Sequence, residues 1–294
     1  MASFLHRNLN NRLSVPEWRS AMSASWKADA PNYGFMLRDE QRVVGVYLAF
    51  YSERTVAGRS ERFCNLASWA VHKDYRVHSV RLLKALLAQD GYHFTDMGPT
   101  GNVIALNARM KFRFLDTSAV VIPNLPWPTR PGRTRISADP EVIESVLTGD
   151  ELELYRDHAQ AAAARHLVLI SGSDSCYVMF RRRWWRRLPF FAAILHVSNP
   201  ELFRHAAGPL ACYLLLHHRA VVTVAELRII GQRPRLSFRL PQPKAITGKR
   251  DSWVVRDYSR RYYGTIPPKM YRSASLEPEQ VDELYSELVC VPRW

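Results

Sequence analysis

Cysteine is scarce in this chain of 294 residues, which has only Cys64, Cys176, Cys212 and Cys290. These residues are widely spaced, none belongs to a CxxC pair, and all lie in apolar runs. Such a pattern is typical of small buried side chains in a reducing compartment. It excludes a disulfide framework and a cysteine zinc site.

Long apolar runs are absent too. Arg, His, Asn or Glu interrupts every stretch that approaches the ~18 apolar residues of a membrane-spanning helix. From Met1 to Ser20 the chain is polar and charged where a signal peptide needs an apolar stretch. These two absences predict a soluble, cytoplasmic protein. The chain also lacks HExxH, GxSxG, Walker and dinucleotide motifs and any His, Cys and carboxylate cluster, so no metal is expected.

Acidic residues are few. The chain has 27 Asp and Glu against 41 Lys and Arg, a formal net charge of +14. This excess favours an anionic partner: nucleic acid, acidic lipid headgroups, an acidic carrier protein or a phosphate-bearing cofactor. The composition does not choose among them, and arginines that only keep a surface hydrated explain it equally well. It does not indicate an oligomeric state.

The apolar fraction of 47% predicts a substantial core, and the length suits two domains. In the first half, β-branched and aromatic runs with tight turns between them predict a three-stranded meander, and apolar spacings of three and four then predict a helix. The order predicts a mixed α/β fold with a crossover between the third and fourth strands. The expected elements are strands at 33–37, 43–51 and 63–71, a helix at 79–89, a strand at 92–97, a helix at 102–109 and a strand at 112–121.

The second half repeats this order after a stretch with four prolines, 123–131. Val71 and Val197 each end the strand before the crossover helix, an offset of 126 residues (197 − 71). We therefore predict a first lobe at 1–122, a linker at 123–138 and a second copy at 139–294. The expected elements are broken helix at 139–166, strands at 167–170, 176–180 and 190–197, a helix at 199–216, a strand at 221–230 and a final helix at 277–289.

The run 68–83 has the pattern of a strand, a short basic loop and a helix N-terminus. A helix N-terminus exposes unpaired N–H groups and favours anions. Arg76, His78 and Arg81 add donors at the same place, which indicates an anion site. The simpler interpretation is that these side chains hydrate the start of a helix.

The segment from Trp69 to Asp116 resembles the cofactor-binding half of the GNAT superfamily of acyl-CoA-dependent N-acyltransferases. That family has a phosphate loop R/Q-x-x-G-x-G/A, and here the matching run keeps Arg76 but has Ser79 and Arg81 at the glycines. The run 106–116 resembles the family's L-Y-E-K-L-G-F-x-x-L-D. Asn107 stands where many members carry the tyrosine that protonates the leaving thiolate, and Lys111 stands at the usual glycine.

The resemblance implies two tandem GNAT-like lobes and direct acyl transfer from acetyl-CoA or a longer acyl-CoA to an amine on a sugar, amino acid or polyamine, or to a hydroxyl. Backbone N–H groups of the splayed strand, at Trp69, Ala70 and Val71, would orient the acyl carbonyl. The implied cofactor contacts are Trp69, Ala70, Val71, Arg76, Val77, His78, Ser79, Val80, Arg81 and Asn107.

Three residues near the ends of the splaying strands are candidates for the general base: Glu61, His72 and Asp96. Spacing does not specify any of them, and each residue type is more often a surface or capping residue. In Thr95 to Thr100, Gly98 and Pro99 are explained by turn chemistry alone.

Other interpretations remain open. The departures at Arg81, Asn107 and Lys111 suit a degenerate GNAT scaffold that binds an anionic partner without catalysis. A transferase that takes its acyl group from aminoacyl-tRNA or acyl-carrier protein suits the charge as well. Binding of nucleic acid would weaken steeply with salt, whereas CoA binding would change less.

Two features of the second half also have two interpretations. The run 181–187 mixes five arginines with Trp184 and Trp185, which suits a membrane surface or nucleobases, but a solvated turn is the simpler account. The second crossover keeps Arg204 but has Ala207 and Pro209 where glycines are wanted. We therefore expect the second copy not to bind cofactor.

Overall fold

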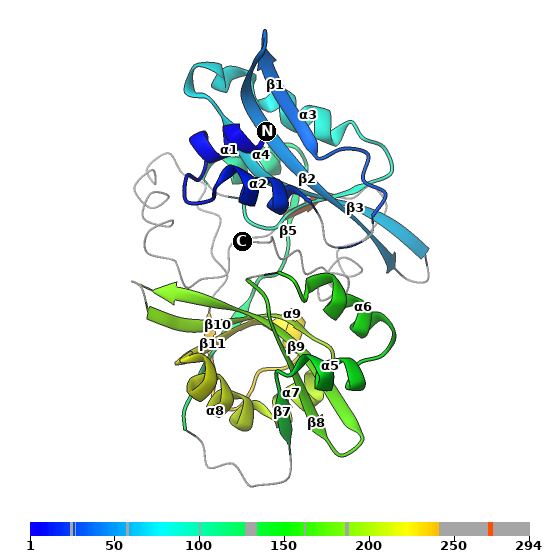
Figure 1. The fold of residues 1–294 in the computed structure, drawn as a ribbon, viewed down its shortest axis with the longest axis vertical. Coiled ribbons are helices and arrows are strands. Elements are labelled where there is room, and N and C mark those ends of the chain that lie inside the picture. The colour runs from blue at the N-terminus through cyan, green and yellow to red at the C-terminus, as the bar shows by residue number, and fades with distance from the viewer. Residues whose placement is uncertain are drawn as a thin grey trace. The chain divides into compact units, whose positions relative to one another are not determined.

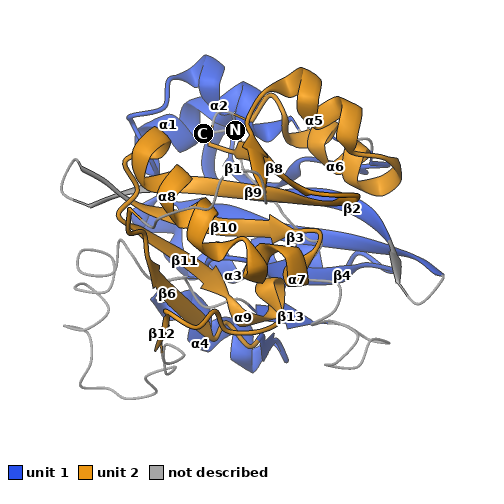
Figure 2. Cartoon of the chain, turned by 90° about the horizontal axis from the view of Figure 1, so that it is seen from below, with its two compact units in different colours: residues 1–115, 268–280, 293–294 blue, residues 116–267, 281–292 orange. Residues whose placement is uncertain are grey.

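The computed structural model of the protein describes residues 1–23, 26, 28–56, 59–99, 101–126, 134–161, 163–185, 188–240 and 270–272. The chain divides into two compact units (Figures 1 and 2). Of the described residues, unit 1 contains 1–115 and 270–272, and unit 2 contains 116–240. None of the described helices is long and apolar enough to cross a membrane.

Unit 1 is built around a mixed sheet with the strand order β1-β2-β3-β4-β13-β5. Strands β3 and β4 are parallel, and the other neighbours are antiparallel. The elements are α1 (Ala2–Asn8), α2 (Val15–Met22), β1 (Gly34–Asp39), β2 (Arg42–Val56), β3 (Arg59–Val71), the 3-10 helix η1 (Lys73–His78), α3 (Ser79–Leu87), β4 (His93–Asp96), α4 (Asn102–Arg109), β5 (Arg113–Phe114) and β13 (Met270–Arg272).

Helices cover both faces of this sheet. The capping box of α2 joins Ser14 and Glu17, each side chain accepting a bond from the other's backbone N–H. It fixes the helix whose Trp18 packs with Val46 and Leu48 on one face. On the other face the apolar stripe of α3 packs against Tyr47 and its neighbours on β2, β3 and β4.

Unit 2 has a second mixed sheet with the order β12-β6-β11-β10-β9-β8-β7, in which only β10 and β11 are parallel neighbours. Its elements are β6 (Ala119–Pro123), β7 (Arg135–Ser137), α5 (Pro140–Val146), α6 (Gly149–His158), β8 (Arg165–Ser171), β9 (Asp174–Trp185), β10 (Leu188–Val197), α7 (Pro200–His205), α8 (Ala207–His218), β11 (Val222–Glu226), α9 (Leu227–Ile230) and β12 (Phe238–Leu240).

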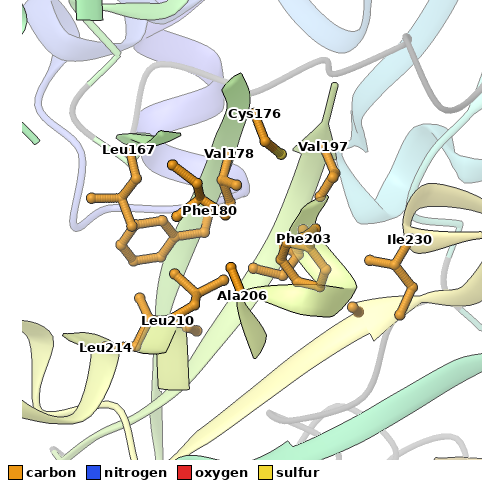
Figure 3. Packing of buried hydrophobic residues seen from close by; sticks show 14 of the residues in the cluster. Leu167, Cys176, Val178, Phe180, Val197, Phe203, Ala206, Leu210, Leu214 and Ile230 are labelled. Atoms are coloured by element: carbon orange, nitrogen blue, oxygen red, sulfur yellow. The ribbon is translucent and has the colours of Figure 1, made fainter. Parts of the chain in front are cut away.

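The core of unit 2 has the same two-sided arrangement. Figure 3 shows Phe180 of β9 packed among side chains of the crossover helices, including Phe203, Leu210 and Leu214. On the opposite face α5 and α6 pack against β8 and β9 around Tyr177. The mixed α/β fold class and the second copy of the lobe are thus both confirmed.

The repeat extends to an irregularity in the strand before each crossover. Leu48 pairs with Ala67 and Val46 with Ala70, so β3 has one residue more than β2 between these pairs. In unit 2, β10 gains one residue at Leu195, between its partners on β9. The offset of 126 residues that relates Val71 to Val197 also carries Trp69 onto Leu195.

The two sheets exchange strands along the chain. Strand β13, from the far end of the chain, lies between β4 and β5 in unit 1. Strand β6, which directly follows unit 1, lies between β11 and β12 in unit 2. Figure 2 colours each strand with the unit whose sheet it completes.

This exchange differs from the domain boundaries at 122 and 139. Residues 119–122 belong to the second sheet, β7 lies inside the expected linker, and β13 belongs to the first sheet. Sequence patterns that extend over neighbouring residues could not reveal this exchange. Strand β13 has only three residues, and its partners are 156 or more positions away (270 − 114).

Other expectations change in detail. The strand expected at 112–121 is two strands, β5 and β6, in different sheets. The strand expected at 221–230 ends at Glu226 and continues as α9. Helix α1 was not expected. The final helix expected at 277–289 and most of the proline stretch lie outside the described residues.

Helix α4 ends in a Schellman motif built on a residue that is not glycine. The N–H of Phe112 bonds to the Asn107 carbonyl at 3.0 Å, and that of Lys111 bonds to the Ala108 carbonyl at 3.1 Å. Lys111 has φ +65°, the left-handed conformation that glycine adopts without strain. Its position is the one where the GNAT motif has glycine.

We expect Lys111→Gly to raise the free energy of unfolding by ~1 kcal/mol, because it relieves left-handed strain at a position that already ends the helix. Urea denaturation at equilibrium measures this. The same change at the helical position Arg109 is the control, and it should destabilise by a similar amount. A destabilised Lys111→Gly variant would contradict the capping assignment.

A fragment of residues 1–116 should not fold cooperatively, because it lacks the strand that pairs with both β4 and β5. Hydrogen exchange of the β4 amides tests this, with the full chain as reference. Adding a synthetic peptide of residues 266–276 should restore protection. Protected β4 amides in the fragment alone would show that β13 is not needed for the sheet.

Candidate functional site

Strands β3 and β4 of unit 1 diverge beyond their third pair of residues. Their parallel pairing runs from Phe63 opposite His93 to Asn65 opposite Thr95 and stops there. Strand β3 continues to Val71, still paired with β2 on its other side. Within the described chain, no strand pairs with this last stretch of β3 on the side where β4 has diverged.

The bulge of β3 lies in this open stretch. Ser68 has φ +53°, an unusual conformation for a residue other than glycine. Such strain persists only where the surrounding structure imposes it, and it is common at binding sites. Two regular pairs follow, Val46 with Ala70 and Gly45 with Val71, so the strand is rigid again directly beyond the bulge.

The bulge decides which amides point to the open edge. The N–H of His72 donates to the Val44 carbonyl on β2 at 2.8 Å. Alternate residues of a strand direct their N–H to opposite sides. The amides of Trp69 and Val71 therefore face the open edge, whereas that of Ala70 faces β2. Two of the three predicted backbone donors fit a ligand at this edge, and Ala70 does not.

An aromatic stack supports the bulge from the α3 side. The rings of Tyr47 and Trp69 lie 4.6 Å apart at an angle of 5°. Burial, and secondarily the charge of Asp96, raises the pKa of Tyr47, so this phenol stays protonated. The indole Nε1 of Trp69 is buried and has no hydrogen-bond partner in the structure described. The indole N–H of Trp69 is thus a hydrogen-bond donor available to a ligand at the open edge.

Asp96 ends β4 and is the most strongly perturbed of the three base candidates. Its side chain is buried, accepting a bond from Asn107 Nδ2 at 2.9 Å and one from the Gly98 N–H at 3.2 Å. Burial raises its pKa to about 6, although both hydrogen bonds oppose the shift. A carboxylate in this state can exchange a proton near neutral pH.

Asn107 donates a hydrogen bond to the carboxylate of Asp96. It is completely buried on α4, and its Oδ1 has no hydrogen-bond partner in the part of the chain described. The sequence predicted Asn107 as a cofactor contact. Its amide Nδ2 is bonded to Asp96, and the cofactor contact stays a prediction.

The other two base candidates are already paired. Glu61 Oε2 lies 2.9 Å from His93 Nε2, in an ion pair that is largely buried on the histidine side. His72 Nδ1 lies 3.3 Å from Asp74 Oδ2, without the geometry of a hydrogen bond, and Asp74 is mostly exposed. Neither shares the buried setting of Asp96.

The basic segment before α3 is more regular than the predicted loop. Residues Lys73–His78 form the 3-10 helix η1, whose last turn is closed by the Ser79 N–H bonding to the Arg76 carbonyl. The side chains of Arg76, His78 and Arg81 are exposed, and Val77 is 82% exposed. The cationic groups remain available to an anion, but the Ser79 amide is already used.

Unit 2 lacks these features at the equivalent places. Helix α7 starts with Pro200, which has no N–H, and the Asn199 side chain already accepts a bond from Leu202 N at 3.0 Å. Glu226 ends β11 as Asp96 ends β4, each opposite the first residue of the exchanged strand. Arg228 Nε lies 2.5 Å from Glu226 Oε2, so that carboxylate is held in a buried ion pair.

Solved structures place this arrangement among known folds. A GCN5-related N-acetyltransferase from Anabaena variabilis superposes with a TM-score of 0.54 over 92% of this chain and 69% of its own, at 10% sequence identity. The chain has the fold of the GNAT superfamily. In this fold the open edge between β3 and β4, with its bulge, lies in the segment whose sequence resembled the family's cofactor-binding half.

Two further structures match less closely. A GCN5-related N-acetyltransferase from Kribbella flavida has a TM-score of 0.41, 12% identity and coverage of 68% of this chain and 51% of its own. The Saccharomyces cerevisiae N-myristoyltransferase with bound myristoyl-CoA has a TM-score of 0.45, 11% identity and coverage of 91% and 77%. No protein-family model and no curated protein sequence matches the chain. At 10% identity, the likeness to the Anabaena structure shows the fold alone.

Sequence reasoning missed Tyr47 and the strain at Ser68. Tyr47 looks like any aromatic residue of a strand, and its electrostatic interaction with Asp96 joins distant segments. In the described ranges, no three His, Cys, Asp or Glu side chains come together as they would around a metal ion. Cys64 is buried, and burial raises its pKa to about 12, which argues against a nucleophilic thiolate.

Proposed function

We propose that unit 1 transfers an acyl group from acyl-CoA to an amine acceptor by direct attack on the thioester. The observation that carries the proposal is the bulged, open edge of β3 beside the buried carboxylate of Asp96. The amides of Trp69 and Val71 face this edge, and none of the described strands pairs with it there. Such amides bind a carbonyl oxygen and stabilise the negative charge that develops on it.

The donor would lie along this open edge. The pantetheine amide groups can pair with the free backbone of β3 as an additional strand would. The exposed side chains of Arg76, His78 and Arg81 then lie where the pyrophosphate and ribose phosphate would bind. The name of the Anabaena protein, an N-acetyltransferase, supports an acetyl or other acyl group as cargo.

Asp96 is the proposed proton acceptor. The amine nitrogen attacks the carbonyl carbon, the C–N bond forms and the C–S bond breaks. The nitrogen loses a proton to the Asp96 carboxylate, directly or through water, and CoA departs as a thiolate that takes a proton from solvent. A thiol pKa near ~8.5 makes this departure feasible without the tyrosine that Asn107 replaces. Asn107 is then a positioning residue.

The exposed cationic side chains also fit a bulkier anionic donor, such as an acyl-carrier protein or aminoacyl-tRNA. A non-catalytic scaffold would use the same cations. A macromolecular anion would contact more of the surface that gives the chain its charge of +14. Its affinity would therefore fall more steeply with salt than that of acyl-CoA.

Arg76→Ala should weaken binding of acetyl-CoA and longer acyl-CoAs by roughly 10- to 100-fold, as expected for one charged hydrogen bond. Calorimetry of the full chain at two salt concentrations measures this. The matched control is Arg204→Ala, at the corresponding crossover of unit 2, which should leave the affinity unchanged. Equal losses in both variants, or no binding to the parent protein, would overturn the proposed cofactor site.

Asp96→Asn should lower kcat/KM for amine acylation about 100-fold or more and leave acyl-CoA affinity unchanged. In the parent protein kcat/KM should rise with pH through about 6, the pKa to which burial raises this carboxyl. The raised pKa also means that ionisation costs folding free energy. The parent should therefore lose stability relative to the variant as pH rises from 3.8 to about 6, by as much as ~3 kcal/mol.

Glu226→Gln is the control for this experiment. It removes the equivalent carboxylate of unit 2 from its ion pair with Arg228, so it should destabilise the protein without changing kcat/KM. An Asp96→Asn variant with an unaltered pH profile would exclude Asp96 as the proton acceptor.

A further inference from the structure

A row of facing residues crosses the sheet of unit 1 at the point where β3 and β4 part. Asn65 of β3 pairs with Thr95 of β4, Thr95 pairs with Tyr271 of β13, and Tyr271 pairs with Arg113 of β5. Paired residues of neighbouring strands project from the same face. The row is therefore a single feature of one face of the sheet, and its tyrosine comes from the exchanged strand.

The row lies on the face opposite the α3 helix. Met270, the neighbour of Tyr271 on β13, is buried in the core cluster that α3 covers. Successive side chains of a strand alternate between faces, so Tyr271 projects from the other side. The hydrogen bond from Thr95 Oγ1 to Asn65 Oδ1, at 2.9 Å, joins two members of the row on that side.

The hydroxyl of Tyr271 has no hydrogen-bond partner among the described residues. The residue is only 5% exposed, and its Oη makes no hydrogen bond in the described structure. Tyr51, another buried tyrosine of this sheet, bonds through its hydroxyl to both Asn32 and Gln89 at 2.8 and 2.9 Å. A buried hydroxyl without a partner lowers stability, so its presence beside the open edge points to a ligand that completes it.

The position of Tyr271 and the neutral groups beside it indicate which kind of ligand would bind there. Neighbouring strands lie ~4.8 Å apart, and Tyr271 stands one strand away from the last β3–β4 pair, where the acyl group would be attacked. Asp96 pairs with Met270 and so projects from the α3 face, opposite to Tyr271, and the amine proton would pass to its carboxylate through water. Asn65, Thr95 and Tyr271 are neutral hydrogen-bonding groups, which suit an uncharged oxygen better than a carboxylate that would lose its hydration. Arg113, at the end of the row, is exposed to solvent.

We propose that Tyr271 positions the acyl acceptor by hydrogen bonding to an oxygen close to its amine. The acceptor class is a primary amine with a hydroxyl or similar neutral oxygen about two carbons from the nitrogen, as in amino alcohols and amino sugars. This inference rests on the proposed acyl transfer in unit 1. It assigns to the C-terminal strand a part in substrate choice in addition to its part in the sheet.

The test compares ethanolamine with n-propylamine, which lacks the hydroxyl, as acceptors for acetyl-CoA and the full-length protein. The parent should prefer ethanolamine in kcat/KM by about 10-fold or more, because a site built to bond a hydroxyl rejects the analogue without one. In Tyr271→Phe this ratio should fall towards one, while acetyl-CoA affinity stays unchanged. An equal preference in parent and variant would overturn the inference.

A stability measurement separates positioning from a structural role. Tyr271→Phe removes an unbonded hydroxyl, so the Tm of the ligand-free protein should stay the same or rise. Tyr51→Phe breaks two hydrogen bonds and is the control, which should lower Tm without altering the amine preference. A drop in Tm for Tyr271→Phe would show that its hydroxyl is a structural group.

Two further outcomes separate this inference from the proposed function. Acetyl-CoA binding without transfer to either amine would overturn the role of Tyr271 and leave the donor site standing. No binding of acetyl-CoA would overturn the proposed function and this inference with it.

Discussion

The sheet of unit 1 depends on the hydrogen bonds that β13 makes along both of its edges. Strand β4 has four residues and pairs with β3 over only three positions, and β5 has two residues. Neither would form a stable ladder alone, because short strands gain too little from pairing to offset the entropy of ordering. By filling the space between them, β13 lets β4 diverge from β3 without exposing an unpaired edge on both sides.

Because β4 diverges, the end of β3 has an open edge. The proposed acyl transfer depends on this edge. The bulge at Ser68 turns the amides of Trp69 and Val71 outward and brings the indole over Tyr47. Asp96, at the end of the shortened β4, is buried between the sheet and α4, and its hydrogen bonds within the described residues come from two neutral donors. Neutral donors hold the carboxylate in place and lower its pKa less than a cation would, so the effect of burial prevails.

The second unit has the same fold without the features on which the proposed chemistry rests. Its strand β10 has the bulge, but β10 and β11 stay paired to Ala193, which matches Ala67 by the offset of 126 and lies beyond Asn65. Its terminal carboxylate is neutralised by Arg228, and the start of its crossover helix is closed by Asn199 and Pro200. The six strands that correspond in the two sheets have the same order, so a few side chains at equivalent positions distinguish the two edges.

Local patterns in the sequence determined the elements and their order. The capping residues of α2, the apolar stripe of α3 and the β-branched runs of β2 and β9 act within a few residues, so the mixed fold, its repeat and the basic segment at Arg76 could be predicted. Tertiary structure alone decided the strand exchange, the strain at Ser68 and the burial that supports Asp96, rather than Glu61 or His72, as the proposed proton acceptor. These depend on contacts between distant segments, above all β13 with β4, and on burial, which no local pattern encodes.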